Sequence, residues 1–298
     1  MGERDISASL VAELISAQFP EWADRPVRPV EVGGWDHRTF RLGDDLVVRL
    51  PRRAACAAQI DKERRWLPLL APSVPLPIPE PVGDGRPSDL YPYPWSVRRW
   101  LPGEPMLGAA VVDLVEVATD LAGFLVSLRG VDTSGGPQPG AHNFLRGGSL
   151  SAYDTETRDA LAVLGPDIDR RRTERVWDAA LETRWDAPAV WVHGDVAPSN
   201  LLVGNGRISA VIDFGGCAVG DPACDLTMAW TTFAGKSRDV FRARIGLDDG
   251  TWARAAGWAL WKALVTLLDG RLGGEAARGR FGWRLPVAGV LHDLLEGR

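Results

Sequence analysis

The feature that most constrains the fold of this 298-residue chain is a pair of short β-type runs beyond its middle. Residues 201–203 and 208–212 are joined by Gly-Asn-Gly at 204–206, a turn sequence that predicts a β-hairpin. Asp195 lies shortly before the first run, and Asp213 ends the second. Because a hairpin brings its two ends together, we expect both carboxylates to face one small volume.

Asn200 adds an amide oxygen at the start of the hairpin. Together with Asp195 and Asp213 it makes a set of three oxygen ligands, which suits a hard divalent cation. Each of the three also has an ordinary interpretation, since Asp and Asn are common in turns and Asp213 can cap a strand end. Several spacings would have to coincide for all three ordinary interpretations to hold at once.

The residues around these acids follow an ordered pattern. They read H-G-D-x-x-x-x-N from His193 to Asn200, I-D-F-G over 212–215, and G-D-P-x-x-D-L over 220–226. His193 ends an apolar run, so we expect a buried imidazole that orients the loop through hydrogen bonds. Protein kinases place H-R-D-x-x-x-x-N and D-F-G in the same order at their catalytic site. The stretch therefore resembles the aminoglycoside phosphotransferase family, a kinase-like group that phosphorylates small molecules.

The resemblance implies a role for each of these polar residues. By the family pattern, Asp195 is the catalytic base, and Asn200 and Asp213 hold Mg²⁺. Asp221 and Asp225 mainly support the loop. The resemblance also implies an α+β, bilobal protein-kinase-like fold, with an antiparallel β-sheet N-lobe and a helical C-lobe.

The first 50 residues predict a helix followed by an antiparallel β-meander. Apolar residues at helical spacing favour a helix over 6–19, closed by Pro20. Three β-type runs follow, at 27–32, 38–42 and 46–50.

Gly33 and Gly34 lie between the first two of these runs. Two glycines let backbone N–H groups approach an anion closely. Kinase-like folds lay their first hairpin over the nucleotide phosphates at this position, so the resemblance makes both glycines nucleotide-binding candidates. A Gly-Gly turn is also common in ordinary hairpins, and only the motif at Asp195 favours the phosphate interpretation.

Arg49 ends the third run, and Glu63 lies inside the helix expected after it. Kinase-like enzymes pair a strand lysine with a helix glutamate to hold the α- and β-phosphates. None of the lysines, Lys62, Lys236 and Lys262, lies on an expected strand here, so Arg49 would take that role with Glu63. Arginine binds phosphate as a planar fork and not as a point charge. The alternative is a surface ion pair worth at most about 1 kcal/mol.

Residues 71–94 are rich in proline, which excludes a helix and forces extended or turn geometry. A β-type run follows over 95–101. Its position resembles the hinge strand of the family. By that resemblance, the carbonyl of Arg99 and the amide of Leu101 bind the adenine edge of the nucleotide.

We therefore expect an N-lobe over residues 1–101 and a C-lobe over 102–298 that holds the catalytic loop and the substrate, with the nucleotide between the lobes. Helices dominate the second part. The expected helical segments are 111–128, 174–185, 225–233, 238–245, 251–268 and 285–294.

A Gly-rich loop at 130–153 is long enough to carry function, and it contains His142, Asn143 and Arg146. Tryptophans at helical spacing follow it. Indole faces can line a pocket for a sugar or a cation, but such residues belong more often to the core. They are Trp230, Trp252, Trp258 and Trp261.

Composition narrows the classes of partner. The net charge is −5, and the whole acidic excess lies after residue 100, which argues against nucleic acid and permits a cationic substrate. There is no apolar run of about 18 residues or more, and the N-terminus is too polar for a signal peptide. We therefore expect a cytoplasmic protein with no membrane partner. Cys56, Cys217 and Cys224 lack metal-ligand spacing and are expected to be free thiols.

Together these observations predict a phosphotransferase that uses Mg²⁺ and moves the γ-phosphoryl group of ATP or GTP to a hydroxyl of a small molecule. The favoured acceptor is an aminoglycoside-type antibiotic, and only the acidic bias after residue 100 favours it. The alternatives are a kinase of a metabolite such as an amino alcohol or a sugar, a kinase of a macrolide, and a nucleotide-binding protein without turnover. The intact Asp195, Asn200 and Asp213 argue against the last, and Arg49 is its best support.

Overall fold

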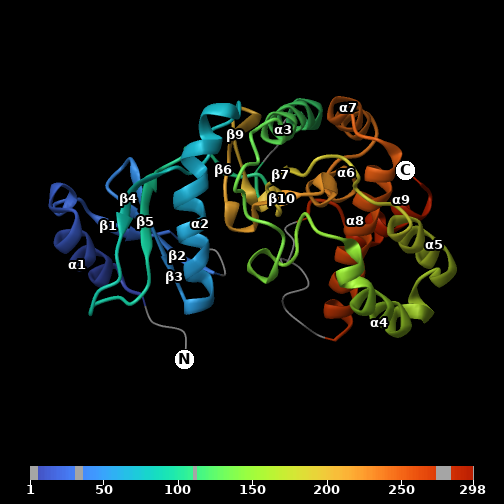
Figure 1. The fold of residues 1–298 in the computed structure, drawn as a ribbon, viewed down its shortest axis with the longest axis horizontal. Coiled ribbons are helices and arrows are strands. Elements are labelled where there is room, and N and C mark those ends of the chain that lie inside the picture. The colour runs from blue at the N-terminus through green and yellow to red at the C-terminus, as the bar shows by residue number, and fades with distance from the viewer. Residues whose placement is uncertain (1–5, 31–35, 110–112, 273–282, 298) are drawn as a thin grey trace. The chain divides into compact units, whose positions relative to one another are not determined.

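The structure is a computed structural model that describes most of the chain, namely residues 6–30, 36–109, 113–272 and 283–297. Its internal contacts divide the chain into two compact units. The first consists of Met1–Ser73 and Pro77–Pro102, and the second of Val74–Leu76 and Gly103–Arg298. In Figure 1 the blue and teal elements belong to the first unit, and the colours from green to red belong to the second.

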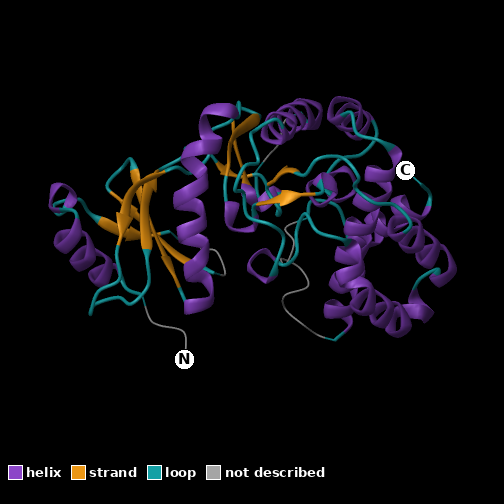
Figure 2. Ribbon diagram, in the orientation of Figure 1, coloured by secondary structure: helices purple, strands orange, loops and turns teal. Residues whose placement is uncertain are grey.

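The first unit is built on a five-stranded antiparallel sheet with the order β1-β2-β3-β5-β4 (Figure 2). Its strands are β1 (Val27–Pro29), β2 (His37–Leu42), β3 (Leu46–Pro51), β4 (Pro81–Gly85) and β5 (Trp95–Arg99). The antiparallel meander predicted for the first 50 residues is confirmed. Strand β4 lies within the proline-rich stretch, at the edge of the sheet, where a missing N–H does the least harm.

One face of this sheet is covered by α1 (Ala8–Gln18). Ser7 caps the helix, since its hydroxyl accepts a hydrogen bond from the N–H of Leu10 at 3.2 Å. Buried side chains of α1 pack with those of β2, β3 and β5 in one apolar core. From the helix these are Val11, Leu14 and Ile15.

Strand β3 also presents a polar side chain to the other face. Along it the buried Leu46, Val48 and Leu50 alternate with the more accessible Val47 and Arg49. Helix α2 (Ala54–Leu70) lies on that second face and packs against β3, β4 and β5. The sheet therefore has an apolar face toward α1 and a face that carries Arg49 toward α2.

Helices dominate the second unit, as the sequence predicts. They are α3 (Leu114–Arg129), α4 (Asp154–Leu164), α5 (Arg170–Leu181), α6 (Met228–Thr231), α7 (Lys236–Ile245), α8 (Asp249–Arg271) and α9 (Val287–Leu295). Helix α8 forms the centre of this group, because it packs against α4, α5, α6 and α9 and against the short 3-10 segment Pro222–Leu226. The tryptophans singled out in the sequence are buried core residues here.

Two small antiparallel sheets complete the second unit. One pairs β7 (Val190–Val192) with β10 (Ala218–Gly220). The other has the order β6-β8-β9, with β6 (Glu104–Pro105), β8 (Leu201–Gly204) and β9 (Arg207–Val211). Asn205 and Gly206 both have positive φ angles, 52° and 76°, as a two-residue hairpin turn requires. The predicted hairpin is therefore confirmed.

Two helical segments differ from those expected from the sequence. Helix α4 is not among the expected helices, although Thr157, Ala160, Leu161 and Leu164 form a buried stripe at helical spacing. The helix expected over 225–233 is broken into a 3-10 segment and the short α6.

Among the helices of the described residues, we find none that combines the length and the apolar character needed to cross a bilayer. None of the three cysteines forms a disulfide within the described residues, as predicted, and all three are buried.

Candidate active site

The segment His193–Asp195 leaves β7 in close backbone contact with the turn after Asp213. Gly194 has φ +84°, a left-handed conformation that favours glycine. A Cβ atom at Gly194 would lie 2.2 Å from the carbonyl oxygen of Gly216. Because only glycine fits there, the backbones that carry Asp195 and Asp213 can lie against each other.

Asp225 anchors this segment from the helical side. Its carboxylate is 3% exposed and accepts hydrogen bonds from the backbone N–H of His193 at 2.7 Å and of Gly194 at 2.8 Å. Burial raises the pKa of Asp225, while these two N–H groups oppose the shift. The predicted supporting role of Asp225 is therefore confirmed.

His193 is fully buried and joins the two acidic segments. Its Nε2 lies 2.9 Å from the carbonyl oxygen of Ile212 and must donate to it. Its Nδ1 lies 3.2 Å from the backbone N–H of Asp195 and must accept from it. These two contacts select the neutral Nε2–H tautomer and confirm that His193 is a satisfied imidazole that orients the loop.

Asp195 and Asn200 form a pair. The side-chain nitrogen of Asn200 donates to the carbonyl oxygen of Asp195 at 2.9 Å and to its carboxylate Oδ2 at 3.1 Å. Asp195 itself is only half-buried, so its carboxylate keeps access to solvent. One of its oxygens is thus held in place by Asn200.

Asp213 is brought close to Asn200 by the backbone of its neighbour Ile212. The N–H of Ile212 donates to the carbonyl oxygen of Asn200 at 2.9 Å, which closes the open end of the hairpin. Asp213 then takes a left-handed conformation with φ +65°, unusual for a residue with a side chain. The structure thereby brings the Asp195, Asn200 and Asp213 segments together, as the hairpin argument predicts.

A loop from the Gly-rich stretch braces the same turn. The Asn143 side chain is fully buried and donates to the carbonyl oxygens of Arg146 at 2.9 Å and of Gly216 at 3.1 Å. Its Oδ1 accepts from the N–H of Gly140 at 2.9 Å. Asn143 therefore ties this loop to the turn that faces Gly194.

The first unit contains a buried ion cluster centred on Glu63. Arg49 donates to both carboxylate oxygens of Glu63, at 2.8 and 3.2 Å, and Arg98 donates to Oε2 at 2.7 Å. Burial by itself raises the pKa of Glu63, but the charges of Arg49 and Arg98 outweigh it and hold that pKa well below its ordinary value. The expected pairing of Arg49 with Glu63 is confirmed, and its alternative as a surface pair is wrong, since the Glu63 side chain is 0% exposed.

The remaining nucleotide-binding candidates occupy different environments. Arg99 ends β5 and is exposed, and Leu101 follows it with an N–H that has no hydrogen-bond partner among the described residues. Gly33 and Gly34 lie outside the described residues. The roles predicted for Arg99 and Leu101 at the adenine edge stay predictions.

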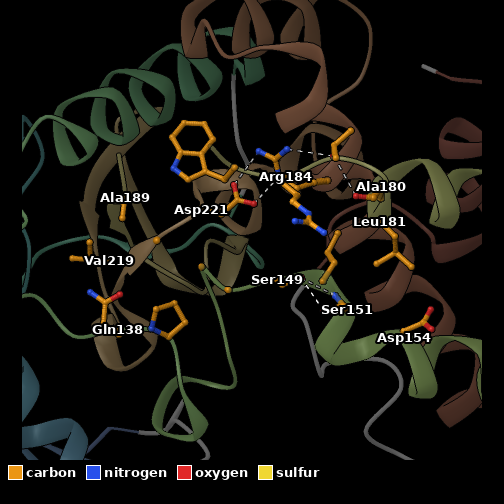
Figure 3. A pocket seen from close by; sticks show the side chains of 18 residues that line it. Gln138, Ser149, Ser151, Asp154, Ala180, Leu181, Arg184, Ala189, Val219 and Asp221 are labelled. Atoms are coloured by element: carbon orange, nitrogen blue, oxygen red, sulfur yellow. Dashed lines mark hydrogen bonds and ion pairs between the residues drawn. The ribbon is translucent and has the colours of Figure 1, made fainter. Parts of the chain in front are cut away.

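A cavity of about 670 Å³ lies elsewhere in the second unit (Figure 3). Its lining includes Ala189, just before β7, and Val219–Asp221, at the end of β10. Because β7 and β10 are antiparallel, this is the opposite end of the strand pair from Asp195. Arg254 forms an ion pair with Asp221 at 2.6 Å in the cavity wall. The cavity is therefore separate from the acidic segments described above.

No cluster of three or more His, Cys, Asp or Glu side chains suited to a metal ion occurs within the described part of the chain. Asn200 and Asp213 form a smaller set of one amide and one carboxylate. Mg²⁺ bound with a nucleotide commonly takes only one or two protein oxygens, with phosphates and water supplying the rest.

Sequence reasoning misses Arg98, and it names Asn143 only as part of a loop long enough to carry function. A signal for Arg98 was available, because neighbouring arginines on a strand face opposite sides of the sheet and one of Arg98 and Arg99 must therefore point toward α2. Arg98 is 2% exposed, whereas Arg99 is exposed. Asn143 offers no comparable signal, since its partner Gly216 is 73 residues away in the chain.

The model of the phosphotransferase enzyme family matches residues 26–258 of the chain. The chain belongs to this family. The match begins before β1, ends within α8 and includes every residue assigned above to the acidic segments. The predicted family and the prediction of an enzyme are therefore confirmed. No curated protein sequence matches the phosphotransferase described here.

Solved structures show the same kinase-like fold. The GDP complex of wild-type aminoglycoside 2'-phosphotransferase-IIIa is 20% identical to this phosphotransferase, with a TM-score of 0.72, and the match covers 98% of this chain and 99% of that one. The apoenzyme of macrolide 2'-phosphotransferase MphH from Brachybacterium faecium is 25% identical, with a TM-score of 0.58 and coverage of 87% and 92%. The GDP and kanamycin complex of APH(2")-IIia is 21% identical, with a TM-score of 0.68 and coverage of 96% and 97%. The bilobal α+β fold predicted from the sequence is thereby confirmed.

Proposed function

We propose that this phosphotransferase moves the γ-phosphoryl group of ATP or GTP to a hydroxyl of an aminoglycoside-type molecule, with Asp195 as catalytic base. The observation that carries the proposal is the pair of Asp195 and Asn200 on a backbone anchored by Asp225. A carboxylate fixed on one oxygen and accessible on the other suits a group that receives a proton at a defined position.

The reaction follows from that geometry. The acceptor hydroxyl oxygen forms a bond to the γ-phosphorus, and the bond from phosphorus to the β,γ-bridging oxygen breaks, which releases the nucleoside diphosphate. The hydroxyl proton passes to Asp195. Asn200 keeps the carboxylate oriented through this step, and His193 keeps the backbone of Asp195 tied to the segment that carries Asp213.

The residues present fit a magnesium ion. The Asn200 nitrogen is bonded to Asp195, which leaves Oδ1 of Asn200 as the side-chain atom able to bind a cation. Asp213 follows directly after Ile212, whose N–H is bonded to Asn200. We assign Asn200 and Asp213 as the metal ligands. When bound, Mg²⁺ neutralises phosphate oxygens during transfer.

Nucleotide binding is the proposed task of the first unit. Arg49 would bind phosphate oxygens with the part of its guanidinium that Glu63 does not engage, and Glu63 would orient it. The Arg99 carbonyl and the Leu101 N–H would meet the adenine or guanine edge. The backbone at Gly33 and Gly34 would lie over the phosphates, as the family pattern implies. The proposed lobes remain residues 1–101 and 102–298.

Similar proteins and net charge support the proposed class of acceptor. Aminoglycoside 2'-phosphotransferase-IIIa resembles this chain over almost its whole length, and a related structure contains kanamycin. The net charge of −5 permits a polycation. The likeness to MphH supports a macrolide as the second candidate. A nucleoside triphosphate donor is consistent with the cytoplasmic location expected from the sequence.

The test is nucleotide turnover with ATP and with GTP against kanamycin, gentamicin, streptomycin, a macrolide, and simple amino alcohols and sugars. We expect Mg²⁺-dependent turnover with at least one aminoglycoside and none with Asp195→Asn, whose folding and nucleotide affinity should stay close to those of the parent. Turnover of Asp195→Asn within a few-fold of the parent would remove Asp195 from its role. A preference for a macrolide or a metabolite would change the proposed acceptor and leave the proposed reaction unchanged.

A further inference from the structure

The Gly-rich loop at residues 130–153 exposes two apolar side chains that the proposed reaction does not use. Phe144 is 64% exposed and Leu145 is 37% exposed. Phe144 is also the only exposed aromatic residue in the part of the chain that the structure describes. Single apolar residues are common on protein surfaces, but the backbone and the position of this pair are unusual.

The backbone of the pair adopts a conformation that residues with side chains rarely take. The φ angles are +54° at Phe144 and +55° at Leu145, in the left-handed region that favours glycine. The loop has glycines close by, yet these two left-handed positions carry bulky side chains; the glycines are Gly140, Gly147 and Gly148. Such strain persists only where the surrounding structure imposes it, and it is concentrated at active sites and ligand clamps.

Hydrogen bonds on both sides of the pair impose this conformation. The N–H of Leu145 donates to the carbonyl oxygen of Gly140 at 2.9 Å, and the carbonyl oxygen of Leu145 accepts from the N–H of Gly148 at 2.9 Å. The carbonyl oxygen of Phe144 accepts from the hydroxyl of Tyr153. The main chain that carries the exposed Phe144 ring is therefore fixed.

The residues on either side of the pair attach the loop to the catalytic segments. The side chain of Asn143 donates to the carbonyl oxygen of Gly216 at 3.1 Å. The Cβ atom of Arg146 lies 3.3 Å from the position that a Cβ would take on Gly194, the residue before Asp195. Since consecutive Cα atoms are about 3.8 Å apart, the exposed pair lies within about 8 Å of the Cα atom of each anchor.

Arg146 is held at its other end as well. Its guanidinium lies 5.1 Å from the ring centroid of Trp258 and 4.9 Å from that of Trp261, both on α8. Cation–π stacking thus ties the loop to the central helix of the second unit. The exposed Phe144 ring is therefore carried by a braced loop next to the proposed base.

The exposed pair is too small a surface for a protein partner. Every residue of the loop is described, and no other large apolar side chain in it is exposed. A stable protein interface covers about 800 Å² on each partner, far more than two side chains provide. Since the proposed nucleotide contacts belong to the first unit, the acceptor is the small molecule that this pair can meet.

We propose that Phe144 is a specificity-determining residue that binds one face of a sugar ring of the acceptor beside Asp195. An aromatic face carries partial negative charge, and the C–H groups on a sugar face carry partial positive charge, so the two stack. A ring on a fixed backbone loses little conformational entropy when it binds. Aminoglycosides and macrolides contain sugar rings, whereas simple amino alcohols do not. The inference rests on the proposed function, because it takes Asp195 as the group that the acceptor hydroxyl approaches.

Three substitutions separate the aromatic face of Phe144 from its apolar volume. Phe144→Tyr keeps the face, Phe144→Leu keeps apolar volume without the face, and Phe144→Ala removes both. The acceptor KM should rise about tenfold in Phe144→Ala and nearly as much in Phe144→Leu, and it should stay within about threefold of the parent in Phe144→Tyr. The kcat and the nucleotide KM should stay near those of the parent, because the ring contacts the acceptor away from the reacting atoms.

Val126 supplies a control in the same unit. It lies on α3, outside the loop, and is 43% exposed. Val126→Ala also removes an exposed apolar side chain, and it should leave the acceptor KM unchanged. Equal rises of the acceptor KM in Val126→Ala and Phe144→Ala would overturn the proposal, and so would a parent-like acceptor KM in Phe144→Ala.

Acceptor binding without turnover separates this inference from the proposed reaction. Calorimetry with kanamycin and with a macrolide, each in the presence of GDP, gives the Kd of the parent and of Phe144→Ala. We expect the variant to bind about tenfold more weakly. Weaker binding by the variant with no phosphorylation of either compound by the parent would contradict the reaction and leave the role of Phe144 in place. Turnover by the parent with an unchanged Kd in the variant would overturn the role of Phe144 and leave the reaction, and failure of the parent to bind either compound would overturn both.

Discussion

Glu63 in the first unit of this phosphotransferase and Asp225 in the second are both buried carboxylates, and the two are stabilised in different ways. Glu63 of the first unit is held by the full charges of Arg49 and Arg98, and its pKa is lowered. Asp225 of the second unit is held by two backbone N–H groups, and its pKa is raised. Burial opposes ionisation in both, so the difference comes from the partners.

The comparison teaches that charged partners overcome desolvation where backbone dipoles do not. It also relates each arrangement to a task. Side-chain partners can turn toward a ligand, so the Glu63 cluster can present Arg49 to a phosphate. Backbone partners cannot move without the chain, so Asp225 fixes the segment that carries Asp195.

The largest effect should come from breaking the Glu63 cluster. Glu63→Ala leaves two guanidiniums without their acid, and removing one partner of a buried ion pair costs about 3–5 kcal/mol of unfolding free energy. Denaturant unfolding measures it. The exposed pair of Arg25 and Asp45 is the control, because Asp45→Ala should cost no more than about 1 kcal/mol. Equal losses of unfolding free energy in the two variants would contradict the expected difference between a buried and an exposed ion pair.

The next largest effect should distinguish the kinetic roles of the two arginines of that cluster. The Arg49 side chain is 14% exposed and that of Arg98 is 3%, so only Arg49 has room to meet a ligand. Arg49→Ala should lower kcat/KM about 10²-fold, which corresponds to about 2.7 kcal/mol, and Arg49→Lys should recover only part of it. Arg98→Ala should lower stability with a smaller kinetic effect. Parent-like kcat/KM in Arg49→Ala would remove it from phosphate binding.

A smaller effect should come from weakening the Asp225 anchor. Asp225→Asn keeps one acceptor oxygen but leaves the N–H of His193 or Gly194 unpaired, which costs about 1–3 kcal/mol. Because the backbone before Asp195 would shift, kcat should fall while the nucleotide KM stays near that of the parent. Steady-state kinetics beside urea unfolding measure both quantities. Loss of stability with unchanged kcat would mean that Asp225 does not position Asp195.

The smallest effects are in pH dependence, and they have opposite signs. The pKa of Glu63 is lowered in the folded state, so its stabilising contribution is present above its ordinary value of 4.5 and is lost as pH falls through the folded pKa. The pKa of Asp225 is raised, so its protonation adds stability as pH falls from the folded pKa toward 3.8. Relative to the parent, the loss of unfolding free energy in Glu63→Gln should shrink in acid. The loss in Asp225→Asn should grow. Unfolding measured from pH 7 to 3 tests both trends.

The sequence allowed the catalytic segment to be predicted because its contacts are local. Asp195, Asn200 and Asp213 are joined by one hairpin, and the turn at Asn205 that forms it has a specific signature. The predicted helix that carries Glu63 also followed from short-range pattern. These parts depend on backbone geometry within about 20 residues, which sequence spacing reports directly.

The buried polar contacts between distant segments could not be predicted in the same way. The side chain of Asn143 reaches the carbonyl oxygen of Gly216 through packing that no local pattern encodes. The break in the helix expected at 225–233 has a similar origin, because the side chain of Asp225 is committed to backbone groups 31 and 32 residues earlier. Tertiary hydrogen bonds overrode local propensity there.

The burial of every cysteine makes this phosphotransferase a convenient subject for site-directed labelling. Cys56, Cys217 and Cys224 are all shielded, and burial raises the pKa of Cys56 and of Cys224, so their thiols react slowly with maleimides at neutral pH. The native sequence can therefore be kept while one new thiol is placed on each unit, for example by Ser88→Cys and Ala179→Cys at exposed positions. A fluorophore pair at these sites would report, molecule by molecule, how the separation of the two units responds to nucleotide.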